Sequence, residues 1–132
     1  MDSGNIGFVL LCAAFVFVMT PGLAMFYGGL VRKKNVVNTM MTSIFIIGVG
    51  IVMWVLFGYS LSFAPSGNAF IGDFRWLGLE GVSLTEGYTD GASIPNMVFS
   101  AFQMMFAVIT PALITGAVAG RMKFKSIFVF TI

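Results

Sequence analysis

Four apolar residues follow one another at helical spacing in a long uncharged part of the sequence: Phe102, Phe106, Ile109 and Leu113. Steps of four, three and four residues place them on one face of an α-helix, with the two phenyl rings one turn apart. A ring face attracts a cation by about 0.5 to 2 kcal/mol, and two rings together can close a narrow pore to water. The same stripe is typical of helix packing, which spacing alone favours.

Other reactive groups are scarce. The sequence has no histidine, and its single cysteine, Cys12, lies in an apolar run and is expected to be a core residue. The long apolar stretches of the sequence contain no carboxylate, and no glycine-rich phosphate loop joins a strand to a helix. We therefore expect no enzyme, no metal site and no cofactor. The net charge of +2 is too small to indicate nucleic-acid binding.

The stripe lies in one of several stretches that are long enough to span a membrane. Of the 132 residues 58% are hydrophobic and only 9% are charged, whereas soluble domains carry about 25% charged residues. Uncharged stretches at about 6–31, 39–64 and 93–119 are each long enough to cross a bilayer, and residues 124–132 are expected to begin an incomplete fourth span. The sequence predicts an all-α integral membrane protein, a polytopic helical bundle in which residues 1–132 are part of a single domain.

The basic residues predict the orientation of these spans. Six of the seven Lys and Arg lie in two short turns: Arg32, Lys33, Lys34, Arg121, Lys123 and Lys125. Because cytoplasmic turns carry an excess of Lys and Arg, both turns are expected on the cytoplasmic side. The amino terminus and the acidic loop 65–92, which opens with a turn at 65–68, are then outside the cell.

Three blocks of sequence, in order, resemble the ammonium transporter family. The first runs from Thr20 to Val36 and contains the segment Phe26-Tyr27-Gly28-Gly29-Leu30-Val31-Arg32. The second, Trp54 to Leu61, is similar to the end of that family's second helix. The third runs from Ala101 to Thr110 and is followed by Gly116 to Phe124 at the expected distance. The resemblance covers nearly the whole chain.

The resemblance implies a homotrimer in the plasma or inner membrane, with one pore in each protomer for ammonium or ammonia. It implies an outer site that holds ammonium by cation–π contact, with Phe102 beside it, and a gate beneath of which Phe106 is one ring. Leu23, Ile109 and Leu113 fall where the family lines its hydrophobic pore, so the stripe is now favoured as a pathway. A nitrogen-regulatory protein of the PII class is the implied cytoplasmic partner.

Some parts of the family's pattern are not in this sequence. The pore histidines, the outer tryptophan, the aspartate below it and the second gating phenylalanine belong to later helices of the family. Gly120 stands where an acid is expected before Arg121. Three other interpretations stay open: an ammonium sensor, a related Rhesus-type gas channel, which the Phe26–Arg32 block disfavours, and an inactive truncated fragment.

Overall fold

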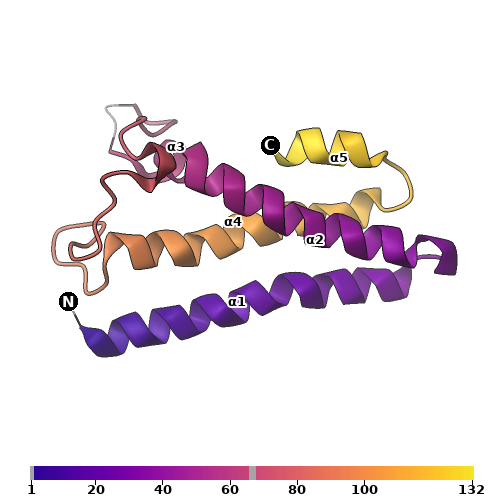
Figure 1. The fold of residues 1–132 in the computed structure, drawn as a ribbon, viewed down its shortest axis with the longest axis horizontal. Coiled ribbons are helices and arrows are strands. Elements are labelled where there is room, and N and C mark those ends of the chain that lie inside the picture. The colour runs from indigo at the N-terminus through magenta and orange to yellow at the C-terminus, as the bar shows by residue number, and fades with distance from the viewer. Residues whose placement is uncertain (1, 66–67) are drawn as a thin grey trace.

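The computed structural model describes residues 2–65 and 68–132, and within them it contains helices and no strand (Figure 1). Ser66 and Gly67 of the expected turn lie outside the described residues. The α-helices are α1 (Ser3–Leu30), α2 (Val36–Met53), α3 (Tyr59–Phe63), α4 (Asn96–Val118) and α5 (Phe124–Thr131). Three helical stretches are long and apolar enough to cross a membrane: Ser3–Leu30, Lys33–Phe63 and Asn96–Val118. The all-α polytopic membrane fold is confirmed.

The first two long helices begin before the positions expected from hydropathy. The Asp2 carboxylate accepts a hydrogen bond from the Gly4 amide at 2.9 Å, and α1 therefore begins at Ser3, before the expected start at residue 6. A short 3₁₀ turn, Lys33–Asn35, leads directly into α2 at Val36, so the second helix also begins before residue 39. The basic residues before Val36 thus belong partly to the start of this helix.

The second span is not a uniform α-helix. Between α2 and α3 the chain makes one π-helical turn, Trp54–Gly58, in which the Tyr59 amide donates to the Trp54 carbonyl. One extra residue in the turn changes which side chains face the bundle. Tyr59 and Ser60 follow this turn directly, and neither residue has measurable exposure.

Small and hydroxylated residues form the contacts among α1, α2 and α4, all of which pack against one another. The buried face of α1 carries Ala13, Thr20, Ala24 and Gly28. Such residues let helix backbones approach closely in a membrane, where no hydrophobic effect drives helices together. A Cβ added at Gly50 of α2, for example, would lie 3.4 Å from Cα of Val108 on α4.

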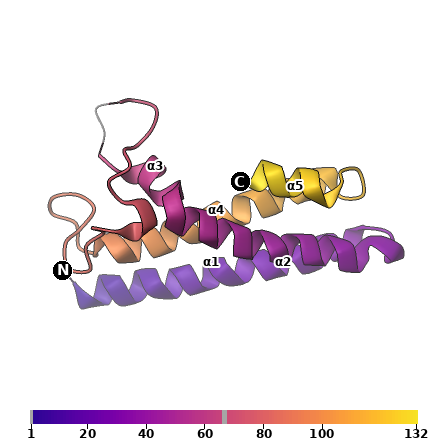
Figure 2. The same cartoon turned by 45° about the horizontal axis from the view of Figure 1, so that its top comes forward.

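The loops and turns lie at the two ends of the bundle (Figures 1 and 2), and the charged residues of the sequence divide between these ends. The amino terminus and the loop residues 68–95 lie together at one end, which we name the acidic end, where the Asp2 amide donates to the Ser93 carbonyl at 3.0 Å. The turns 31–35 and 119–123 lie at the other, the basic end. Helix α5 returns from the basic end along α2, with the Phe45 and Phe124 rings 5.1 Å apart.

Candidate functional site

The structure brings the two stripe phenylalanines together on α4. The ring centroids of Phe102 and Phe106 are 5.2 Å apart, and the ring planes meet at 73°, an edge-to-face arrangement. Phe106 is 41% exposed within the described residues. The pair thus presents aromatic surface outside the contacts that hold α4 in the bundle, and this surface can attract a cation or exclude water.

The other residues of the expected pore differ in exposure. Leu113 is 49% exposed, whereas Ile109 is only 6% exposed although it shares the helical face. Leu23 of α1 is partly buried against the cluster of Ile46, Ala112 and Ile127. Because α4 contacts both α1 and α2, Ile109 is buried within the bundle, whereas Phe106 and Leu113 of the same stripe are exposed.

A hydrogen bond that spacing did not indicate ties α1 to this stripe. The Tyr27 hydroxyl donates to the Leu113 carbonyl at 2.9 Å. The phenol ring lies over Gly116, where an added Cβ would be 2.5 Å from Cζ of Tyr27. The missing side chain at Gly116 is therefore what lets Tyr27 reach Leu113. The sequence signal was the helical repeat of small residues Ala112, Gly116 and Gly120.

Gly116→Ala is expected to destabilise the protein by about 1 to 2 kcal/mol, because the new methyl displaces the Tyr27 ring and breaks its hydrogen bond. Heating in detergent, followed by size-exclusion chromatography, measures the loss. Tyr27→Ala should cost a comparable amount alone, yet adding Gly116→Ala to it should cost little more. Additive losses in the double variant would contradict the contact.

Six aromatic side chains form a second cluster, at the acidic end: Trp54, Tyr59, Phe63, Trp76, Tyr88 and Phe99. Tyr59 stacks on Trp76 at 5.5 Å with ring planes 15° apart, and Tyr88 stacks on Phe99 at 4.9 Å. Two polar groups join this cluster to α4, because the Tyr59 hydroxyl donates to the Asn96 side-chain oxygen and Trp54 Nε1 donates to Ser100 Oγ. The cluster fixes the start of α4, from which Phe102 and Phe106 project.

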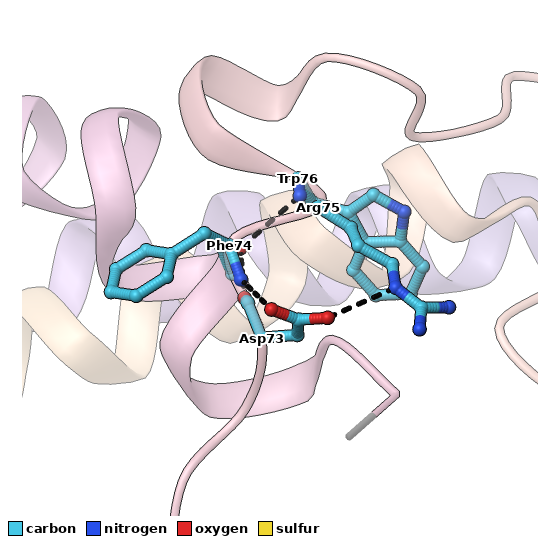
Figure 3. Close-up of polar contacts among 5 residues, drawn as sticks. Asp73, Phe74, Arg75 and Trp76 are labelled. Carbon is cyan, nitrogen blue, oxygen red and sulfur yellow. Dashed lines mark hydrogen bonds and ion pairs between the residues drawn. The ribbon is translucent and has the colours of Figure 1, made fainter. Parts of the chain in front are cut away.

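The loop segment from Asp73 to Trp76 covers the end of the second span (Figure 3). The Asp73 carboxylate accepts from the Phe74 amide at 2.8 Å and pairs with Arg75 Nε at 3.0 Å. Ser60 donates to the Asp73 carbonyl and accepts from the Trp76 amide. In the described part of the chain no three His, Cys, Asp or Glu residues gather as a metal site would require.

Comparison with known proteins identifies the family. The sequence model of the Ammonium Transporter Family matches residues 7–132 of this chain. The chain belongs to this family. It is a multi-pass membrane protein, and its named relatives are transporters rather than enzymes.

The relatives of this chain are about three to four times as long as the chain. An ammonium transporter of Bacillus subtilis strain 168 is 49% identical over 133 residues, which cover 100% of this chain and 32% of the relative. One from Mycobacterium tuberculosis strain H37Rv is 43% identical over 143 residues, covering 98% and 30%. The chain thus spans about a third of the length of these ammonium transporters.

Solved structures agree with the family assignment. Mep2 of Saccharomyces cerevisiae matches with a TM-score of 0.83 and 33% identity, over 99% of this chain and 29% of that chain. Mep2 of Candida albicans matches with the same TM-score and 28% identity, over 99% and 28%. The arrangement of α1 to α5 is thus similar to part of a larger membrane protein in this family.

Proposed function

We propose that these residues form part of the transport pathway of an ammonium transporter. The observation that carries the proposal is the edge-to-face pair of Phe102 and Phe106, partly exposed on an uncharged span of a chain from this family. Phe102 contributes to an outer site that recruits ammonium by cation–π contact. Phe106 is one ring of the gate, and Leu23, Ile109 and Leu113 belong to the hydrophobic pore wall.

The chemistry of this wall sets what can pass. A charge without a partner is costly in an apolar environment, and the stretches 6–31, 39–64 and 93–119 carry no ionisable side chain besides Cys12 and the tyrosines. Na⁺ and K⁺ cannot shed their charge, whereas ammonium can transfer a proton to water at the pore mouth and continue as ammonia. Recruitment by an aromatic face followed by an apolar constriction therefore selects ammonium over the metal cations.

The positions of the charges support an orientation in the membrane, and family membership supports the partners. We place the amino terminus outside the cell membrane and the basic end in the cytoplasm, because five basic residues lie in its two turns and a sixth, Lys125, lies at the start of α5. Substrate then meets the acidic end first. The complete protein is proposed to be a homotrimer, with a PII-class regulatory protein binding at the basic end; family membership supports both.

Phe102→Ala is expected to raise the KM for methylammonium uptake about 2- to 30-fold, the loss of a cation–π contact of about 0.5 to 2 kcal/mol, with little change in maximal rate. Uptake is measured in transport-deficient cells that express the complete coding sequence. Phe106→Ala, in parallel, should change uptake through the gate. Phe15→Ala is the matched control, since Phe15 lies on α1 and is 65% exposed.

Equal effects of Phe102→Ala and Phe15→Ala on uptake would contradict the recruitment site. A stable, correctly assembled protein that moves no methylammonium in any variant would overturn the transporter proposal itself. That second result would favour the sensor interpretation.

A further inference from the structure

A recess of about 530 Å³ opens at the basic end of the bundle, between the turn after α1 and the turn after α4. Its lining consists of Leu30, Val31, Arg32, Lys34, Asn35, Ala119, Gly120 and Arg121. Two arginines and one lysine therefore line one concave surface, together with the apolar residues Leu30 and Val31 at the end of α1.

These three cations have no carboxylate nearby. The five acids of the sequence are Asp2, Asp73, Glu80, Glu86 and Asp90, all of which belong to the acidic end. Within residues 2–65 and 68–132 the one ion pair joins Arg75 to Asp73, far along the sequence from either basic turn. The positive charge of the recess is thus not neutralised within the described chain.

Gly120 explains why the recess lacks a counter-charge. This residue precedes Arg121 at the position where the resemblance to the family leads us to expect an acid. Its φ is +72°, and an added Cβ would meet only Nδ2 of Asn35, at an ordinary contact distance of 3.5 Å. An added Cβ thus clashes with no neighbour, although the positive φ strains any L side chain there, and this chain supplies no carboxylate at this position.

We propose that the recess binds a phosphate group through Arg32, Lys34 and Arg121. A guanidinium group matches phosphate oxygens with two parallel hydrogen bonds, and the lysine adds a third positive charge. Leu30 is 70% exposed beside the recess, at the end of α1, where a span meets the headgroup layer of a bilayer. Basic pockets at this depth suit anionic headgroups. The phosphodiester of an anionic lipid and free phosphate share this chemistry.

The first experiment compares two pairs of substitutions that remove the same charge. The protein, expressed from its complete coding sequence and purified in nonionic detergent, is titrated with short-chain phosphatidylglycerol, short-chain phosphatidylcholine and inorganic phosphate. Native mass spectrometry measures binding. Arg32→Gln with Arg121→Gln is compared with Lys33→Gln with Lys123→Gln, since Lys33 and Lys123 lie in the same turns but do not line the recess.

We expect saturable binding of phosphatidylglycerol but not of phosphatidylcholine. The recess pair should weaken that binding about 20- to 30-fold, because each basic residue contributes about fivefold, and the control pair less than about twofold. If the binding of inorganic phosphate also depends on the recess pair, free phosphate is supported as the ligand. If the lipid binds and inorganic phosphate does not, the lipid headgroup is supported. Equal losses in both pairs, or saturable binding of neither anion, would overturn the proposal.

A second comparison avoids variants that lose positive charge. Gly120→Asp adds a carboxylate to the recess, and Gly120→Asn adds an uncharged side chain of the same shape. Aspartate and asparagine tolerate positive φ to a similar degree, so the backbone cost is matched. The aspartate variant should bind the anion at least about tenfold more weakly than the asparagine variant. Equal affinities would overturn the assignment of the phosphate group to this recess.

Discussion

Replacing Tyr59 by alanine is expected to lower the free energy of unfolding by about 3 to 5 kcal/mol or more, the range measured for large aromatic truncations in protein cores. Tyr59 has no measurable exposure and contacts the rings of Trp54, Phe63 and Trp76. The truncation leaves a cavity among these rings and also removes the hydrogen bond to Asn96. Midpoints of thermal unfolding in detergent, monitored by tryptophan fluorescence, measure the loss.

Tyr59→Phe separates the hydroxyl from the ring. It keeps the ring contacts but leaves the Asn96 oxygen buried without its donor, which costs about 1 to 3 kcal/mol. Asn96 is 4% exposed, so water cannot readily replace the phenol. Tyr88→Phe is the matched control at a tyrosine that is 38% exposed. Equal losses from the two Tyr→Phe changes would contradict a structural role for the buried pair.

Gly72→Ala is expected to cost about 2 to 4 kcal/mol and to release the loop from the end of the second span. The added methyl would overlap the Ser60 carbonyl oxygen and would lie 2.8 Å from that of Leu61. Both obstacles are main-chain atoms of a helix, so no side-chain rotation relieves the overlap. The Gly72 amide also donates to the Leu61 carbonyl at 2.6 Å, a bond that the displacement breaks.

Limited proteolysis at the acidic end measures the release of the loop, because Arg75 offers trypsin a site only three residues away. Faster cleavage is expected in Gly72→Ala and not in Gly7→Ala, since an added Cβ at Gly7 meets no atom within 4 Å. A cleavage rate equal to that of the unmodified chain would show that the loop adapts to the methyl, contrary to this account.

The spans and their class could be predicted from composition because a bilayer imposes one simple requirement, a long run of residues without charge. Local features of the chain determine where each helix begins, which hydropathy does not indicate. The Asp2 cap begins α1 at Ser3, and the 3₁₀ turn joins basic residues to the start of α2. The phenylalanine pair could also be found from spacing, since Phe102 and Phe106 are one turn apart.

Contacts between segments distant in sequence could not be predicted in this way. Spacing placed Ile109 with Phe106 and Leu113 on one face, but packing against neighbouring helices buries Ile109. The bonds from Tyr27 to Leu113 and from Tyr59 to Asn96 join residues 86 and 37 positions apart. Each depends on a close approach of two helices that no local pattern encodes.

The π-helical turn at Trp54–Gly58 affects how this span aligns with a regular α-helix. An α-helix advances about 100° per residue, so one surplus residue offsets every later side chain by that angle. Aligned without a gap to an unbulged helix, Tyr59 and Ser60 would be matched to positions on the wrong face. A one-residue gap in the unbulged helix, placed opposite the turn, restores the correspondence of the side chains after it. Such a gap records the extra residue of the π-helical turn and not a deletion.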